Sequence, residues 1–235
     1  MKHLFLFAIM AFPMTATIIV NDPTMAAPDY SGSTVAFPFG GGLTPGNGSP
    51  GAGGNPGAYR FTTINFNGNG VAGAQAVGEL NVTNVWNFAT QGVLNTIAFR
   101  IDNQLANSPA GSSIQLLFGV RQNNVTYYNA SFSPVGPAWQ TSSVSGLTQA
   151  NFGSAFFTGA PQPNFAASTG ILEVGYFVSA FSPSGGSATM NNDNFCAVGN
   201  GSLNECANVP EPASMALMGS ALLALGAVRR RLRQS

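Results

Sequence analysis

The side chains best suited to catalysis are scarce in this sequence. Its one histidine is His3 and its one lysine is Lys2, both at the N-terminal end. A nucleophilic serine needs an imidazole or an amine as its base, and zinc sites are built mainly from histidine and cysteine. We therefore expect no Ser-His-Asp hydrolase, no cofactor and no metal site, and we expect that the protein is not an enzyme.

Paired carboxylates are the one catalytic arrangement that the composition permits. A glycoside hydrolase needs two of them, one with a raised pKa, and Glu79 with Glu173 or Asp102 could supply the pair. Their spacing does not single them out. Glu173 alternates with Phe177 on the less apolar face of a predicted strand, where a solvated acid is expected. A weak glycoside hydrolase is therefore the third-ranked function.

Aromatic rings form a second group of candidates. A flat ring can stack on a sugar, while Asn and Gln amides bond to its hydroxyls. Tyr127, Tyr128 and Trp139 are the glycan-binding candidates, and Tyr59 could offer a further ring. Since Tyr127 and Tyr128 are adjacent in a predicted strand, one of them must point outward.

Two further sets of residues are expected to be structural. Trp86 shares a face with Leu80, Val82 and Phe88, which predicts a place in the core. The four residues 191–194 could give oxygen ligands to calcium, but they contain one carboxylate, and such a run more often forms a turn.

The elements that must position these side chains are strands. Nine segments alternate in polarity or are rich in β-branched and aromatic residues, and clusters of Asn, Gly, Pro and Ser separate them. They are 34–39, 59–66, 79–88, 94–102, 113–121, 125–133, 139–144, 170–182 and 188–198. We predict an all-β fold, a single jelly-roll-like β-sandwich, with one short helix over 149–157 capped by Thr148. The Gly- and Pro-rich segment 40–57 is expected to be a flexible loop.

The charge distribution argues against nucleic-acid binding. Charged residues make up 7% of the 235 residues, and the segment 28–209 carries three arginines and six acids. Its net charge of −3 leaves no basic patch that could neutralise a row of phosphates.

The N-terminal end has the layout of an export signal. A positive start at Lys2 precedes the mostly apolar segment 4–20, and the small residues Ala26 and Ala27 follow. We expect residues 1–26 to be a signal peptide that is cleaved after Ala26. Pro13 interrupts the apolar segment, so an uncleaved membrane anchor is the alternative.

The C-terminal end combines an apolar run with arginines. Residues 213–228 carry no charge, and as a helix they would span about 24 Å against a hydrocarbon core of about 30 Å. The arginine side chains that follow can extend this marginal span, because their stems lie in lipid while the guanidinium groups reach the headgroups. Positive charge stays on the cytoplasmic side. These anchor residues are Arg229, Arg230, Arg231 and Arg233.

The residues just before this span complete a recognisable pattern. Val209, Pro210, Glu211 and Pro212, an apolar helix and an arginine cluster, in that order, resemble the PEP-CTERM sorting signal of exported bacterial proteins. The two prolines hold the peptide extended, which suits binding by a protease. The resemblance implies that an exosortase, the expected partner, cuts at this motif, often in organisms that make exopolysaccharide. Glu211 would then be a recognition residue in a substrate.

Two cysteines lie upstream of this signal. In an exported chain Cys196 and Cys206 are expected to form a disulfide, because no histidine is near and the turn at 199–201 can bring them together. Reactive thiols are the alternative, although no basic residue nearby would lower a thiol pKa.

A second resemblance concerns the sandwich itself. The segments 125–152 and 170–198 are similar to the later strands of laminin domain IV and carbohydrate-binding-module jelly rolls. The matching features are a strand with Trp139 before a helical turn, and a last strand with Asp193, Asn194 and Phe195. This resemblance implies architecture rather than a ligand.

Together these features predict a sandwich ectodomain over 27–209, followed by a sorting signal over 210–235. We expect an exported protein that is tethered to the membrane through its C-terminal helix before processing. Afterwards it would lie at the cell surface or in the extracellular matrix with a structural or adhesive role. The alternative function is a carbohydrate-binding module that retains matrix exopolysaccharide.

Overall fold

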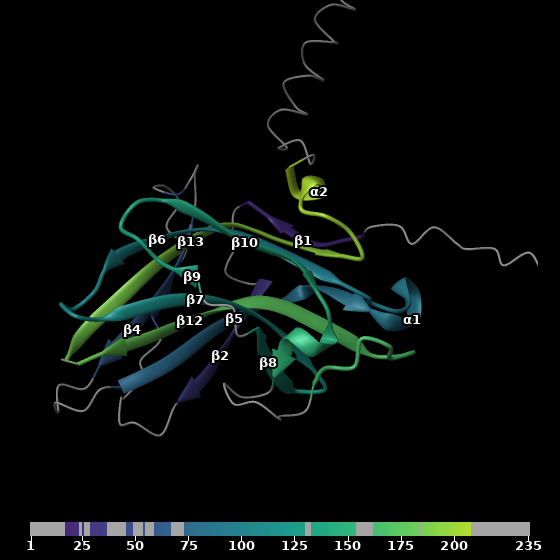
Figure 1. The fold of residues 1–235 in the computed structure, drawn as a ribbon, viewed down its shortest axis with the longest axis horizontal. Helices are drawn as coiled ribbons and strands as arrows, with labels where there is room; N and C mark the ends of the chain where they lie inside the picture. The colour runs from purple at the N-terminus through teal and green to yellow at the C-terminus, as the bar shows by residue number, and fades with distance from the viewer. Residues whose placement is uncertain are drawn as a thin grey trace, which may run out of the picture.

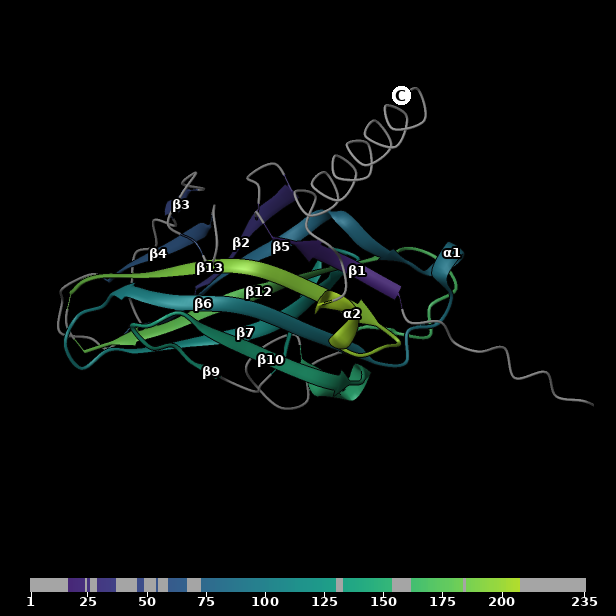
Figure 2. The same ribbon diagram turned by 90° about the horizontal axis from the view of Figure 1, so that it is seen from above.

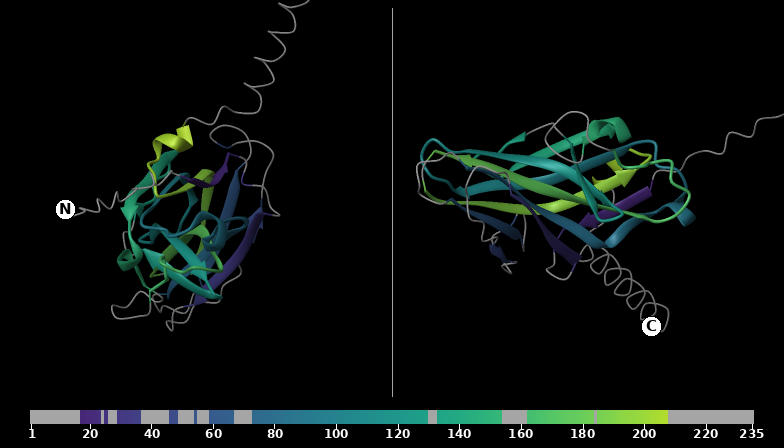
Figure 3. Two further views of the ribbon diagram at one scale, coloured as in Figure 1. Left: turned by 90° about the vertical axis from the view of Figure 1, so that its right-hand side faces the viewer. Right: turned by 90° about the horizontal axis from the view of Figure 1, so that it is seen from below.

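The computed structural model describes residues 17–23, 25, 29–36, 46–48, 54, 59–66, 73–129, 133–153, 162–183 and 185–207. Nearly all regular structure in these segments is β-strand, arranged as two sheets that pack face to face (Figure 1). The left panel of Figure 3 looks along the strands and shows the two layers. The predicted all-β sandwich is therefore confirmed.

The first sheet, called sheet A, has six strands in the described part of the chain. Its order is β10-β6-β13-β4-β3, and β1 lies beside the second half of β13. Figure 2 shows the outer face of this sheet. Its strands are β1 (Thr17–Asp22), β3 (Gly46–Gly48), β4 (Arg60–Phe66), β6 (Ile97–Asn107), β10 (Gln140–Leu147) and β13 (Gly186–Gly199).

The second sheet, sheet B, has seven described strands. Its order is β11-β8-β7-β12-β5-β2, with β9 also paired to β7. The pairings are antiparallel in both sheets. Its strands are β2 (Tyr30–Ala36), β5 (Gly73–Asn87), β7 (Ser113–Gln122), β8 (Val125–Asn129), β9 (Ser133–Pro134), β11 (Phe152–Gly153) and β12 (Ile171–Ser182).

Helical structure in the described segments is limited to single turns. These are α1 (Phe88–Gln91), the 3-10 turn η2 (Gln149–Asn151) and α2 (Asn204–Ala207). No helix of the described part is long and apolar enough to cross a membrane. The predicted spanning segment 213–228 lies outside the described residues.

Of the predicted helix over 149–157, residues 149–151 form a single 3-10 turn, and the prediction is wrong for Phe152 and Gly153, which are strand. Thr148 does precede a helical turn, and its N–H donates to the side chain of Asn151 at 2.7 Å. The turn ends at once because Phe152 is extended and pairs with Asn129 as strand β11. Residues 154–157 lie outside the described part.

The inward faces of the two sheets form one core. Each of the nine predicted strands overlaps an observed strand, and the alternating residues of β7 and β12 are buried as predicted. These residues are Ile114, Leu116, Phe118, Val120, Leu172, Val174, Tyr176 and Val178. Phe99 of β6 stacks on Phe118 of β7 across the sandwich, with ring centroids 5.1 Å apart.

A bulge in β5 changes the predicted face of two residues. Trp86 is buried in the core as expected, but Leu80 lies in a second cluster and Val82 is exposed. The register of β5 against β12 shifts between Leu172 and Val174, so residues 82–85 have no partner in regular register. The Asn81 side-chain oxygen accepts hydrogen bonds from the N–H groups of Thr83 and Asn84, at 3.2 and 2.7 Å. These bonds shape the bulge.

Two segments that were expected to lie outside the sandwich contribute strands to it. Residues 17–22, which the sequence predicts to lie in the signal peptide, form β1 and pair with β13. Residues 46–48 of the predicted flexible loop form β3, which pairs with Phe61–Thr63 of β4. Strand pairing uses main-chain hydrogen bonds, so a glycine-rich segment can add to a sheet edge without side chains to pack.

Candidate functional site

Uncharged polar and aromatic side chains share the outer face of sheet A. Strand register places Gln104 of β6, Asn191 of β13 and Phe61 of β4 in one row. The next pair in the register, Asn192 and Asn103, is fully buried on the inward side, so this row faces outward. The Asn191 amide donates to Gln104 Oε1 at 3.2 Å.

Two aromatic rings, one before each of the strands that flank β6 and β13, meet beside this row. Trp139 directly precedes β10 and Tyr59 directly precedes β4, and both are half-buried. Their ring centroids lie 6.2 Å apart at 78°, an edge-to-face contact. We call Tyr59, Phe61, Gln104, Trp139 and Asn191 the outer strip.

An open pocket of about 390 Å³ lies along the outer strip. It is lined by Tyr59, Phe61, Thr63, Ala106, Asn107, Thr189 and Asn191. The hydroxyl oxygens of Thr63 and Thr189 are 3.0 Å apart and hydrogen-bonded. All of these lining residues are uncharged, so the pocket offers rings, amides and hydroxyls to a neutral ligand.

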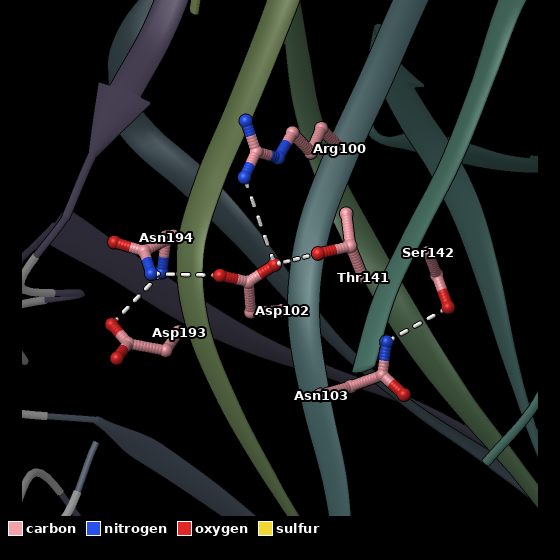
Figure 4. Close-up of polar contacts among 7 residues, drawn as sticks. All are labelled: Arg100, Asp102, Asn103, Thr141, Ser142, Asp193 and Asn194. Carbon is pink, nitrogen blue, oxygen red and sulfur yellow. Dashed lines mark hydrogen bonds and ion pairs between the residues drawn. The ribbon is translucent and has the colours of Figure 1, made fainter. Parts of the chain in front are cut away.

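A polar cluster on sheet A borders the strip (Figure 4). Asp102 Oδ1 accepts a hydrogen bond from the Thr141 hydroxyl at 2.6 Å and lies 4.0 Å from Arg100 Nη2. Its other oxygen accepts from the Asn194 amide at 2.8 Å. These partners occupy both oxygens of a carboxylate that is almost fully buried.

The cluster marks the place where β13 changes neighbour. β13 pairs with β4 up to Asn192 and with β1 from Phe195 onward, and its register against β6 shifts in between. Asn194 has a φ of 52°, the left-handed conformation that asparagine tolerates better than most residues. The predicted turn over 191–194 is therefore a bulged strand, and its side chains hold the bulge.

An ion pair lies between the two sheets. Arg60 Nη2 of β4 is 2.9 Å from Glu79 Oε2 of β5, with side chains 5% and 0% exposed. The guanidinium also lies over the Tyr30 ring, 5.3 Å from its centroid. Burial raises the pKa of Glu79, and Arg60 offsets part of that rise. The pair is closed off from substrate-sized ligands.

The three candidate carboxylates have separate environments. Glu79 is buried against Arg60, Asp102 lies in the polar cluster, and Glu173 forms an ion pair with Arg121 of the neighbouring strand. A glycosidase needs two carboxylates that face one substrate across a cleft. The observed placement does not favour that function.

The predicted glycan-binding tyrosines are both buried. Tyr127 packs in the main core, and Tyr128 packs on Phe177 with ring centroids 4.5 Å apart, so the expectation that one ring is free for a sugar is wrong. Phe177 fits because glycines lie beneath it. A Cβ on Gly78 or Gly119 would come within 1.8 or 2.4 Å of its ring.

Trp139 lies in the outer strip, and its role in binding stays a prediction. Tyr59, which the sequence predicts only as a possible further ring, is in contact with Trp139. Sequence reasoning missed Phe61 and Gln104. In the sequence, both residues lie at outward-facing positions of strands whose polarity alternates. Such positions identify a shared surface only once the order of the strands in the sheet is known.

The predicted disulfide between Cys196 and Cys206 is confirmed. It ties α2 to β13, and α2 also contacts β1. The end of the sandwich is therefore fastened immediately before residue 208.

The sequence that follows α2 matches a known family. Residues 208–231 match the family model described as the PEP-CTERM protein-sorting motif. The chain carries a PEP-CTERM sorting motif. It marks an exported protein and implies processing by an exosortase. The PEP-CTERM match includes the predicted motif residues 209–212 and three of the four predicted anchor arginines, all outside the described part of the structure.

Other comparisons concern the sandwich. No curated protein sequence matches the chain. Among solved structures, it is similar to a family 11 carbohydrate-binding module from Clostridium thermocellum, with a TM-score of 0.45 and 10% identity over 79% of this chain and 95% of that one. It is also similar to a mannan-recognising module, TmCBM27, with a TM-score of 0.42 and 10% identity over 80% of this chain and 99% of that one. For a xylan-binding domain the TM-score is 0.43 and the identity 12%, over 79% of this chain and 96% of that one.

Proposed function

We propose that this exported protein binds a neutral polysaccharide at the cell surface or in the extracellular matrix, through the outer strip of sheet A. The observation that carries the proposal is the contact between Tyr59 and Trp139 beside a pocket lined by uncharged residues. This binding would supply the structural or adhesive role predicted from the sequence.

The chemistry of the strip suits a sugar chain. Aromatic faces pack against the apolar C–H faces of pyranose rings, and amides and hydroxyls bond to sugar hydroxyls. Gln104 and Asn191 supply amides, and Thr63 and Thr189 supply hydroxyls. The pocket volume falls within the range of about 300–1,000 Å³ that is usual for small-molecule sites.

The sorting motif supports delivery of the sandwich to the place where such a polymer accumulates. In this proposal an exosortase cuts at residues 209–212, and the apolar segment with its arginines holds the chain in the membrane until then. The disulfide and α2 keep the cleavage segment attached to the end of β13. The sandwich then remains outside the cell with the outer strip available.

Binding of the exported full chain to polysaccharides tests the proposal. The purified protein is incubated with an insoluble β-glucan, a mannan, a xylan and a polyuronate. We expect retention by at least one neutral polymer and elution by its soluble oligosaccharide. Failure to bind any neutral polymer, or binding to the polyuronate alone, would contradict the proposal.

A pair of variants connects the binding to the strip. The double variant Tyr59→Ala/Trp139→Ala should lose retention because it removes both rings. The matched control is Phe181→Ala, which removes an aromatic ring that is 41% exposed on β12 of the other sheet. Equal loss in both variants would contradict a site on sheet A.

A further inference from the structure

Strand β1 is built into the sandwich although it lies in the segment expected to be removed. Its residues pair with β13 from Thr17 opposite Gly199 to Asp22 opposite Phe195. Ile19 and Val20 are 6% and 1% exposed. Cleavage after Ala26 would remove all of these contacts and leave the end of β13 unpaired on that side.

The residues directly after β1 are fixed as well. Met25 is fully buried in the main core, and its N–H donates to Asp22 Oδ1 at 2.7 Å. Helix α2 contacts both β1 and β13 at the end that the disulfide fastens (Figure 2). β1 therefore belongs to the folded protein.

The sequence before β1 has a positive start, an apolar run and a small residue at its end, in the order of an export signal. Lys2 supplies the positive start, and residues 4–12 are nine consecutive apolar residues, within the usual apolar length of about 7–15. Pro13 ends the apolar run and disfavours helix in the residue that precedes it. Ala16 supplies the small residue that precedes the cut in an A-x-A-like site, with Met14 at the first position of that pattern.

We propose that the export signal comprises residues 1–16 and that a membrane signal peptidase cuts the bond between Ala16 and Thr17. In this hydrolysis one water molecule is consumed and the peptide C–N bond breaks. Ala16 keeps a new carboxylate, and Thr17 gains a free α-amino group. The mature protein then begins with the first residue of β1.

The topology places this cut beside the other processing segment. Thr17 pairs with Gly199 at the end of β13, and the chain runs from there through α2 to the sorting motif at 208. Both membrane-directed sequences are thus attached to the same end of the sandwich. A cut before β1 removes the N-terminal membrane-directed sequence and keeps every described strand of sheet A.

The N-terminus of the exported protein decides between the two sites. The full chain is produced in cells that export it, and its N-terminal sequence and intact mass are determined. We expect the sequence to start Thr-Ile-Ile-Val-Asn-Asp. A start at Ala27, retention of Met1, or a start at any other residue would overturn the proposal.

Two matched substitutions test the site independently of folding. Ala16→Leu replaces the small residue required before the cut and should leave the signal attached. Ala26→Leu makes the same change at the other candidate site and should leave the N-terminus at Thr17. If Ala26→Leu blocks processing, or Ala16→Leu does not, the assignment is wrong.

Discussion

At the scale of single residues, the outer strip is ordered by its own contacts. Trp139 lies edge-to-face against Tyr59, and Asn191 donates to Gln104. Side chains already held in place lose less conformational freedom when a ligand binds. We therefore expect a ligand to bind through a few fixed rings and amides, without rearrangement of the surface.

Removing one ring of the strip should weaken glycan binding measurably. An aromatic contact contributes about 0.5–1.5 kcal/mol beyond its buried area, and about 1.4 kcal/mol is a tenfold change in Kd. Trp139→Ala should therefore raise Kd about tenfold, and Tyr59→Phe, which keeps its ring, should have a smaller effect. Titration calorimetry with the eluting oligosaccharide measures both. A Kd unchanged by Trp139→Ala would show that the ring does not touch the sugar.

The buried Glu79 should make the stability of the fold depend on pH. Burial raises its pKa in the folded protein above the value of about 4.3 in an unfolded chain. The folded state therefore takes up the proton more readily. This contribution is fully present below about pH 4.3 and is lost as the pH rises through the raised pKa.

Glu79→Gln tests this pH dependence. The variant has no proton to release at this position, so its free energy of unfolding should fall less than that of the native protein as the pH rises from 4. Urea unfolding at a series of pH values measures the difference. Parallel curves for the two proteins would contradict the predicted pKa direction.

At the scale of elements, much of the fold follows from local pattern. The alternation in β7 and β12 predicts their buried faces because side chains of a strand point in turn to opposite sides. The bulge in β5 interrupts this alternation, because the Asn81 side chain accepts hydrogen bonds from nearby N–H groups of the same strand. The alternation of polar and apolar residues therefore does not predict the faces on which Leu80 and Val82 lie.

The site was less predictable than the fold. Phe61, Gln104 and Asn191 come from three strands, and only the antiparallel register places them in one row. Tyr128 illustrates the opposite error, because alternation does point it away from the core. Phe177, whose ring fits over Gly78 and Gly119, then packs on Tyr128 in the second cluster.

The disulfide should stabilise the end of β13. Cys196 and Cys206 are 10 residues apart, and closing so short a loop contributes about 2–3 kcal/mol in the chain-entropy model. Cys196→Ser/Cys206→Ser should therefore lower the free energy of unfolding by about that amount. Denaturant unfolding with and without reductant measures it. Reductant should destabilise the native protein and leave the double variant unchanged, and equal sensitivity would argue against this pairing.

At the scale of the whole molecule, the two ends of the described sandwich converge. β1 begins beside the end of β13, and α2 leads from there to the PEP-CTERM motif. The outer strip lies on sheet A where β13 pairs with β4, on the other side of the bulge from β1. A molecule held at its fastened end therefore keeps the strip apart from its point of attachment.

Removal of the sorting sequence should change where the protein is found. A chain ending at Ala207 retains the disulfide and α2 but lacks the PEP-CTERM motif. We expect it to be exported and released to the culture medium, and immunoblots of medium and envelope fractions measure the distribution. Unchanged retention in the envelope would contradict a tether in residues 208–235.

Association of the mature protein with its matrix tests the central claim most directly. Extracellular polysaccharide from the producing cells is collected by sedimentation, and the protein is measured in pellet and supernatant for the native chain and for Tyr59→Ala/Trp139→Ala. The account predicts that the native protein sediments with the polysaccharide and that the double variant, although exported and processed equally, stays in the supernatant. Equal sedimentation of the two proteins would contradict it.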